Sequence, residues 1–468
     1  MGKSDRPHSK TIFVCQKCDK ESLKWLGRCP NCQEWNSFIE RAATTRSISL
    51  EPISLVNQPQ ELSQISIEVT DRFPFPLEEF NRVLGGGLVS GSLVLISGDP
   101  GIGKSTILLQ TSALITRDKG KVVYISGEET PHQIKLRAER LGVKGDNLYL
   151  LAEPNLEVAL NQLEQLSPSL VILDSIQSVY LPESDTAPGS ITQVRECTIK
   201  LMRWAKLSAV PIFIAGHVTK DGAIAGPRVL EHIVDVVLYL EGEPFSAYRL
   251  LRCVKNRFGS TNEIGVFEMK DQGLVEVNNP SQVFMSQRWD EAVGSAVVST
   301  LEGNRPLLVE IQALTNPTSF GLPRRTANGV DFSRLLLVVA VLTKRVSLKL
   351  SNQDIIANVT GGLRIKEPAA DLGIALSIAS SFEDVGVDPQ LVAVGEVGLS
   401  GELRTVSQLD KRVAEAARIG FKRCLVPKAS GKINQIPKAL ELIPVNNLGE
   451  AIGIGLVKNR PRSDTSGN

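Results

Sequence analysis

One short segment, residues 98–105, limits the possible folds of this chain more than any other part of its sequence. It reads Gly-Asp-Pro-Gly-Ile-Gly-Lys-Ser, which fits every fixed position of the phosphate-binding loop (P-loop) pattern. In such a loop the glycines let backbone N–H groups turn toward phosphate oxygens, the lysine adds a positive charge and the hydroxyl can bind Mg²⁺. The segment therefore predicts a nucleotide-binding strand, loop and helix.

The residues on either side agree with this prediction. An apolar run at 92–97 precedes the loop, and a segment with helical spacing of apolar residues follows at 106–115. The start of such a helix directs its positive dipole end at the phosphates, so an isolated glycine-rich turn is the weaker interpretation. We predict an ATPase that binds ATP through Gly98, Asp99, Pro100, Gly101, Ile102, Gly103, Lys104, Ser105 and Thr106, with Lys104 also catalytic.

Two later segments supply acids to this site. Residues 170–174 read Leu-Val-Ile-Leu-Asp, the form of a strand whose terminal Asp174 holds Mg²⁺ together with Ser105. Residues 122–129 form a second strand pattern that ends in Glu128 and Glu129. We expect one of these, preferably Glu128, to polarise the attacking water. The alternatives are a turn-capping aspartate and a solvated acidic helix start.

Four of the seven cysteines fall within eighteen residues, at Cys15, Cys18, Cys29 and Cys32. Two Cys-x2-Cys pairs offer four thiolates for tetrahedral Zn²⁺, with Trp25 and Trp35 as expected packing partners. A disulfide pair and an iron site are the alternative interpretations. The other three cysteines are isolated and predicted to be small buried hydrophobes: Cys197, Cys253 and Cys424.

Length and charge set wider limits. The chain has 468 residues, enough for two or three domains, and a net charge of +1. Any contact with nucleic acid must therefore come from local basic patches. The sequence has no apolar run of about eighteen residues and no apolar signal core at its N-terminus. We expect a soluble cytoplasmic protein that does not enter a membrane.

Composition changes along the chain suggest its domains. Alternating strand and helix patterns predict an α/β domain with a mainly parallel sheet, whose further strands fall at 121–125, 170–173, 211–215 and 234–240. The expected order is a zinc finger at 1–40, a linker at 41–70, the ATPase domain at 71–280, a second αβ domain at 281–457 and a disordered tail at 458–468.

The motif Lys-Asn-Arg-Phe-Gly at 255–259, joined to the cysteine module, the P-loop and Gly-Gly-Gly at 85–87, resembles the RadA/Sms family of bacterial DNA repair proteins over nearly the whole chain. The resemblance implies a RecA-like core. Lys255 and Arg257 are separated by one residue, so an extended strand would point both the same way. The resemblance implies that these catalytic cations reach the ATP of a neighbouring subunit; a solvated basic edge strand is the alternative.

The C-terminal region looks like the α+β peptidase domain of Lon, at residues 361–373 and 394–404. Where Lon has its serine this chain has Ala369 and Ala370, and the lysine position falls near Asp410, beside Lys411. We therefore expect no peptidase activity. Contacts with DNA are expected from two loops, at 181–191 and 217–228, the second of which carries Lys220 and Arg228. The C-terminal region offers further basic residues that could equally form a solvated face: Arg324, Arg325, Lys344, Arg345 and Lys349.

The resemblance implies a DNA-dependent ATPase in recombinational repair. It would form a homo-hexamer, bind ATP, Mg²⁺ and Zn²⁺, and promote branch migration on single-stranded or branched DNA together with a RecA recombinase. Two alternatives belong to other classes of protein. One is an ATP-dependent switch or scaffold without motor action, and the other is a protein-processing ATPase.

Overall fold

The structure is a computed structural model, in which the chain forms two compact units, residues 1–66 and 67–468. The predicted tail at 458–468 and most of the predicted linker at 41–70 lie outside the described residues, and the predicted domain limits stay predictions. The described residues are 11–15, 21–22, 24–25, 27–30, 32–35, 37–42, 61, 63, 72–217, 229–242, 246–286, 288–290, 292–319, 321–430 and 437–457.

The N-terminal unit contains a three-stranded antiparallel sheet in the order β2-β1-β3, made of β1 (Thr11–Cys15), β2 (Glu21–Ser22) and β3 (Phe38–Ala42). The second cysteine pair lies in a tight turn between β2 and β3, closed by a hydrogen bond from the Gln33 N–H to the Cys29 carbonyl (2.9 Å). Trp25 and Trp35 are 50% and 68% exposed. The two indoles, expected as packing partners for the cysteine pairs, therefore lie largely at the surface, and the buried cluster consists of Cys15 and Cys29 with Cys32 against it.

A nine-stranded sheet forms the first part of the larger unit, in the order β14-β13-β12-β11-β6-β10-β9-β7-β8. Its parallel strands include every predicted one, with the P-loop strand β6 in the interior of the sheet. The parallel strands are β6 (Leu93–Gly98), β7 (Val122–Ser126), β8 (Leu148–Ala152), β9 (Leu170–Asp174), β10 (Ile212–His217) and β11 (Val236–Glu241). An antiparallel extension follows, made of β12 (Tyr248–Asn256), β13 (Ile264–Lys270) and β14 (Gly273–Glu276).

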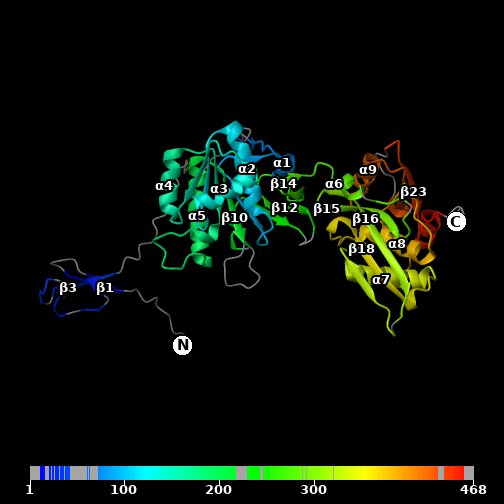
Figure 1. The fold of residues 1–468 in the computed structure, drawn as a ribbon. Coiled ribbons are helices and arrows are strands. Elements are labelled where there is room, and N and C mark those ends of the chain that lie inside the picture. The colour runs from blue at the N-terminus through cyan, green and yellow to red at the C-terminus, as the bar shows by residue number, and fades with distance from the viewer. Residues whose placement is uncertain are drawn as a thin grey trace, which may run out of the picture. The chain divides into compact units, whose positions relative to one another are not determined.

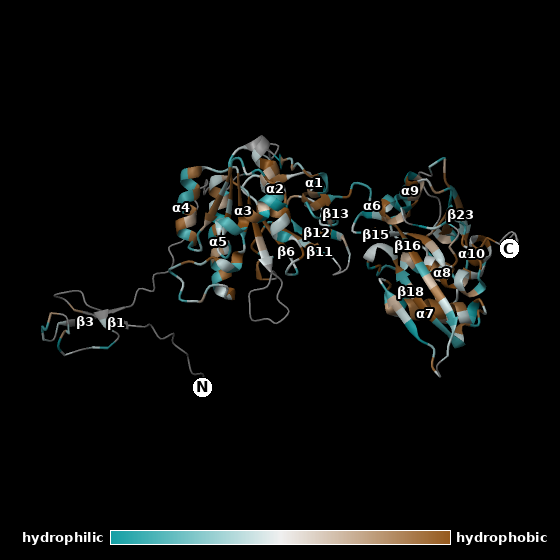
Figure 2. Ribbon diagram, in the orientation of Figure 1, coloured by the Kyte–Doolittle hydropathy of each residue, from teal (hydrophilic) through white to brown (hydrophobic). Residues whose placement is uncertain are grey.

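Helices cover both faces of this sheet (Figure 1). Alternate residues of β6 enter different cores, since Val94 and Ile96 pack with Ile107 of α2, whereas Leu93 and Leu95 pack on the other face. Figure 2 shows the strands between the helices coloured as hydrophobic. One face carries α1 (Glu78–Leu84), α2 (Lys104–Lys119) and α3 (Pro131–Arg140), and the other carries α4 (Leu156–Leu166) and α5 (Ile191–Ser208).

A seven-stranded mixed sheet forms the C-terminal part, in the order β17-β18-β16-β15-β19-β22-β23. Helix α8 (Asp371–Glu383) packs so closely on it that a Cβ on Gly373 would lie 2.0 Å from Val298 Cγ1. The strands are β15 (Ser295–Glu302), β16 (Arg305–Pro317), β17 (Arg325–Asn328), β18 (Gln353–Val359), β19 (Leu391–Ala393), β22 (Arg423–Pro427) and β23 (Glu441–Val445). The other helices are α6 (Pro280–Met285), α7 (Phe332–Arg345), α9 (Leu409–Ile419) and α10 (Leu448–Gly455).

The two sheets of the larger unit share apolar contacts. Ile264 and Val266 of β13 and Phe284 of α6 belong to the same buried cluster as Val298 of β15. Strand β13 of the first sheet and helix α6 therefore share one apolar core with the C-terminal sheet. Within the described residues, each helix is too short or too polar to cross a membrane.

Candidate nucleotide and metal sites

The P-loop joins the end of β6 to the start of α2 through three glycines with positive φ, Gly98 (154°), Gly101 (75°) and Gly103 (117°). A Cβ on Gly98 would lie 2.4 Å from the Leu240 carbonyl oxygen, whereas a Cβ on Gly101 would meet open space. Close packing and backbone conformation therefore both require glycine here. The predicted strand, loop and helix are confirmed.

Lys104 occupies the first turn of α2 and is 4% exposed. Its ammonium group donates to the carbonyl oxygens of Gly98 (2.9 Å) and Asp99 (3.0 Å). Burial lowers the pKa of Lys104, while the carboxylates of Asp174 and Asp99 act in the opposite direction. Because an ammonium group has three donors, these two carbonyl contacts leave room for a phosphate oxygen, and the residues fit a bound nucleotide.

The two predicted acids lie at neighbouring strand ends. Asp174 ends β9 and is paired in register with Ser126 of β7. Glu128 follows β7, and its carboxylate accepts a hydrogen bond from the Ser175 hydroxyl (3.2 Å). Glu129 instead forms an ion pair with Arg137 of α3. The fold therefore brings Glu128 to the residue that follows Asp174 and directs Glu129 to a helix.

Tyr124 is a site residue that the sequence did not indicate. Its hydroxyl donates to Asp174 Oδ2 at 2.5 Å, from a fully buried position on β7. Burial first, and then the nearby Asp174 carboxylate, raise the pKa of Tyr124 well above its usual value. The phenol therefore stays protonated and fixes the orientation of the Asp174 carboxylate through Oδ2.

Lys255 and Arg257 both reach the segment 231–235 of the same chain. The Lys255 ammonium donates to the carbonyl oxygens of Glu231 (2.5 Å) and Val234 (2.8 Å). Arg257 is 3.2 Å from Asp235 Oδ1. Strand β12 ends at Asn256, so the expectation that one strand carries both cations was wrong for Arg257. Lys255 at the end of β12 and Arg257 in the bend that follows nevertheless contact the same segment, residues 231–235.

The two cations and the P-loop lie at opposite ends of the parallel strands. In the parallel pair β11 and β6, Val236 is level with Val94 and Leu240 with Gly98. Strand β12 runs antiparallel to β11, which puts Asn256 level with Val236. At about 3.3 Å per residue, the four steps from Val94 to Gly98 span about 13 Å. The cations therefore lie at the start of the parallel strands, and the P-loop lies at their end.

The basic residues predicted to contact DNA have different surroundings. Lys220 and Arg228 lie outside the described residues. Lys344 and Arg345 are exposed at the end of α7, and Arg324 is exposed before β17. Arg325 is half-buried, and its guanidinium donates to backbone carbonyl oxygens, including that of Leu350 (3.0 Å). Of these cations, Arg325 has the clearest structural role.

Ion pairs occupy the region that corresponds to the peptidase site. Ala369 and Ala370 are buried immediately before α8. Glu367 pairs with Arg412 (2.6 Å), whose side chain is fully buried. Asp410 and Lys411, the two residues considered for the lysine position, are exposed on α9. The cation next to Glu367 is therefore Arg412, and neither Asp410 nor Lys411 occupies that position.

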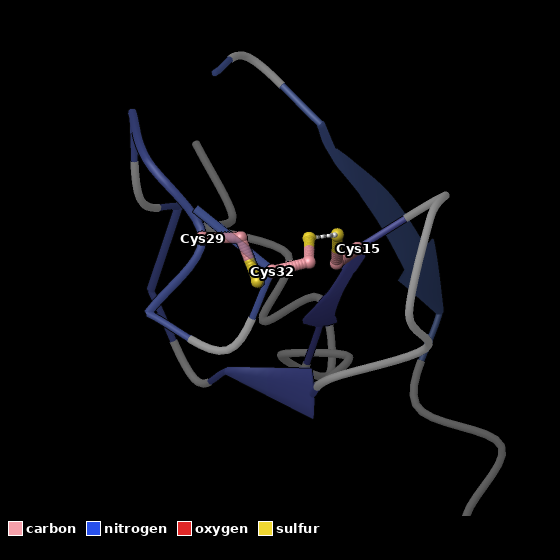
Figure 3. A group of neighbouring side chains, drawn as sticks. All are labelled: Cys15, Cys29 and Cys32. Carbon is pink, nitrogen blue, oxygen red and sulfur yellow. Dashed lines mark hydrogen bonds between the residues drawn. The ribbon is translucent and has the colours of Figure 1, made fainter. Parts of the chain in front are cut away.

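The three described cysteines of the N-terminal unit come together (Figure 3). The sulfur atoms of Cys15, Cys29 and Cys32 lie within 4.8 Å of one another, and those of Cys15 and Cys32 are 3.6 Å apart. Tetrahedral zinc with Zn–S bonds of about 2.3 Å puts its sulfur ligands about 3.8 Å apart, so these residues fit a metal. The three form no disulfide, and Cys18 lies outside the described residues.

The isolated cysteines are buried, as predicted. Burial raises the pKa of Cys197 and Cys424 to about 12 and that of Cys253 to about 11. Thiols with such pKa values are almost entirely protonated near neutral pH, so they pack as small apolar groups.

Comparisons with known proteins agree with these sites. An AAA domain matches residues 58–223, a rubredoxin metal-binding domain matches residues 13–40, and the Mg-chelatase subunit ChlI matches residues 314–430. A KaiC-like protein from Pyrococcus horikoshii OT3 is 19% identical and covers 44% of this chain and 99% of its own, with a TM-score of 0.38, too low to carry an argument.

Relatives named DNA repair protein RadA match almost the whole chain. Those of Halalkalibacterium halodurans and Bacillus subtilis are 53% and 51% identical, and each alignment covers 96% of this chain and 99% of the relative. The chain belongs to the RadA family. The Listeria monocytogenes RadA is 53% identical over 94% of this chain and 97% of its own.

Membership in the RadA family confirms several predictions. The fold is α/β with a RecA-like P-loop core and a mainly parallel sheet, preceded by a metal-binding ribbon and followed by a Lon-like domain. The family and the AAA domain support ATP hydrolysis with Mg²⁺ and a role in DNA repair.

Proposed function

We propose that this chain is a DNA-dependent ATPase of recombinational repair. It promotes branch migration on single-stranded or branched DNA in the cytoplasm, as a homo-hexamer and together with a RecA recombinase. The observation that carries the proposal is the position of Lys255 and Arg257. They lie at the amino ends of the parallel strands, whereas the P-loop of the same chain lies at the carboxyl ends. Cations at the amino ends of the strands can contact the phosphates of a nucleotide only if that nucleotide is bound to another subunit.

The hydrolytic roles follow from the contacts around the P-loop. Lys104 binds phosphate oxygens, and Ser105 and Asp174 hold Mg²⁺, which supplies charge neutralisation at the phosphates when bound. Glu128 orients and polarises the attacking water, because its carboxylate lies beside Ser175. Glu129 is engaged by Arg137 and does not take this role.

The arrangement of the subunits is head-to-tail. Each subunit presents its P-loop at the carboxyl ends of the parallel strands and Lys255 with Arg257 at their amino ends. A heterologous interface between these two surfaces closes into a ring. Contacts with residues 231–235 hold both cations at the amino ends of the strands. In the ring they stabilise the transferred phosphate of the neighbouring subunit, as an arginine finger does.

DNA is held through its phosphates by basic residues of the loop at 217–228 and of the C-terminal domain. The exposed cations Arg324, Lys344 and Arg345 support this role. Arg325 contributes mainly by fixing the backbone around residue 350. The metal of the ribbon is Zn²⁺, since four thiolates with this spacing suit it best.

The C-terminal domain has no peptidase activity. A Ser–Lys peptidase needs a hydroxyl nucleophile and a lysine that can lose its proton. Buried alanines stand at 369 and 370, and the cation bound to Glu367 is Arg412 rather than a lysine. This argues against the alternative of a protein-processing ATPase.

The test is the rate of ATP hydrolysis with and without single-stranded DNA at fixed low salt, for the natural protein and a Lys255→Ala variant. Lys121→Ala is the matched control, because Lys121 is an exposed lysine directly before β7, likewise at the amino end of a parallel strand. We expect DNA to stimulate hydrolysis, Lys255→Ala to lose the stimulation while still binding nucleotide, and the control to keep it. A rate indifferent to DNA would favour the switch or scaffold instead.

A further inference from the structure

Residues at the start of β12 and just before it contact both the P-loop and the C-terminal domain. Near the start of β12, Arg249 Nε donates to the carbonyl oxygen of Ile102, inside the P-loop (3.3 Å). The same guanidinium donates to the Ser246 carbonyl oxygen (2.5 Å). The Ser246 hydroxyl in turn donates to the carbonyl oxygen of Gly361 in the C-terminal domain (3.3 Å). One arginine therefore links the P-loop backbone to a segment that contacts the other domain.

A second arginine of β12 makes a parallel connection. Arg252 pairs with Glu302 at the end of β15 (2.8 Å) and with Glu241 at the end of β11 (3.4 Å). Burial raises the pKa of Glu302, while its hydrogen bond with Arg252 acts in the opposite direction. Leu240, directly before Glu241, packs with its carbonyl oxygen against Gly98. The C-terminal domain is thus connected to Gly98, the first P-loop residue, through the side chains of Glu302, Arg252 and Glu241 and the end of β11.

The turn between β15 and β16 is firmly attached to the ATPase core. The Asn304 N–H donates to the carbonyl oxygen of Asn262 (2.5 Å). Arg305 forms an ion pair with Glu79 of α1, and the two side chains are 10% and 2% exposed. Glu79 also accepts from the Val266 N–H (2.8 Å). A displacement of this turn therefore has to disturb α1 and the start of β13.

Both domains also line one cavity of about 710 Å³. Its walls include Gly98 and Asp99 of the P-loop, Arg252 of β12, and Glu302 and Lys366 of the C-terminal domain. The first two residues of the P-loop and residues of the C-terminal domain therefore face the same cavity.

We propose that Arg249 and Arg252 are positioning residues through which the C-terminal domain sets the affinity of the P-loop for nucleotide. The inference rests on ATP hydrolysis at this P-loop and not on DNA dependence. Since energetic coupling between two sites is reciprocal, ATP binding also changes how strongly the C-terminal domain is held. Events on that domain can then be transmitted to the nucleotide without any C-terminal residue taking part in the chemistry.

The test is a double-mutant cycle on the ion pair between Arg252 and Glu302, with Arg252→Gln, Glu302→Gln and the double variant in the full chain. The affinity for a fluorescent ATP analogue, the KM for ATP and kcat are measured without DNA. Each single variant is expected to weaken nucleotide binding about 5-fold, the low end of typical allosteric couplings. The double variant is expected to be no weaker than either single one, with kcat at saturating ATP changed less than about 2-fold.

Arg404→Gln is the control, because Arg404 forms an ion pair with Glu402 within the C-terminal domain, where the two side chains are 60% and 39% exposed. An Arg252→Lys variant, which keeps a positive charge opposite Glu302, should recover part of the affinity and guards against misfolding of the glutamine variant. If the cycle variants only lower the melting temperature and bind nucleotide as tightly as the control, the pair is a structural brace and the proposal falls. Strictly additive losses would equally contradict a linked path. Absence of DNA stimulation in the natural protein would overturn the proposed function but leave this result interpretable.

Discussion

Two adjacent glutamates after β7 differ in their partners, and this difference predicts their roles. Replacing Glu128 by Gln should lower kcat by about 10²- to 10⁴-fold, the usual contribution of a positioned general base, while nucleotide binding remains. Replacing Glu129 by Gln removes only its ion pair with Arg137 and should cost about 1 kcal/mol of stability or less. Single-turnover hydrolysis and nucleotide titrations measure both effects. Equal losses of kcat in the two variants would contradict the assignment.

The ion pair between Arg412 and Glu367 is expected to dominate the local stability of the Lon-like domain. Arg412→Ala leaves a carboxylate without its bidentate partner and removes bonds to the carbonyl oxygens of Ser299 and Ser407. We expect the free energy of unfolding to fall by about 3–5 kcal/mol, measured by urea denaturation. Arg404→Ala, at an exposed pair, should change it by about 1 kcal/mol or less. Similar small effects of both substitutions would show that the buried pair is not a strong contact.

At the residue scale, the sequence predicted the groups whose chemistry is encoded in local spacing. The P-loop and Asp174 were found because a strand end and a glycine pattern mark them directly. Tyr124 and Arg249 were not found, since their roles depend on through-space contacts with Asp174 and with the Ile102 carbonyl oxygen. A buried tyrosine on the strand next to an acid-ended strand is the only signal that could have indicated Tyr124.

At the scale of elements, the metal-binding ribbon should depend on its ion. A short segment with little apolar core gains its folding energy from the metal, so a strong chelator should release one Zn²⁺ and expose the thiols of the ribbon. We expect four of the seven cysteines to react with a thiol reagent at neutral pH under these conditions. Cys197, Cys253 and Cys424 should stay protected by burial and raised pKa values. Labelling of all seven would mean that the chelator also opened the larger unit.

The parallel strands were predicted where they carry uninterrupted apolar runs, as in β6 and β9, because both faces of these strands are covered. Strand β8 was missed although it reads Leu-Tyr-Leu-Leu-Ala, and at the sheet edge its residues are half-buried or exposed. Strand β12 was expected only around Lys255 and Arg257, and β13 and β14 were not predicted. The cations of β12, Arg249, Arg252 and Lys255, recur at every third residue, which is not the alternation typical of a strand. Arg252 pairs with Glu302 of the C-terminal domain and Lys255 binds the Glu231 carbonyl oxygen, and local spacing does not reveal these distant contacts.

At the scale of the whole molecule, the separation of the P-loop from Lys255 predicts complementation between two inactive variants. Lys104→Ala removes the phosphate-binding cation and Lys255→Ala removes the cation offered to a neighbour, so neither variant alone should show DNA-stimulated hydrolysis. Mixing them creates interfaces at which an intact P-loop faces an intact Lys255, and about a quarter of the sites in randomly mixed rings should recover. Hydrolysis measured across mixing ratios checks this. A mixture as inactive as its components would show that the cations act within their own subunit.

The head-to-tail arrangement has a further consequence for how activity depends on closure. If each complete site needs the P-loop of one subunit and the cations of the next, an open row of n subunits holds only n − 1 complete sites. The subunit at one end has a P-loop without a cation, and the subunit at the other end has a cation without a P-loop. Joining the two ends creates the missing site, so closing the ring and completing the set of active sites are a single event.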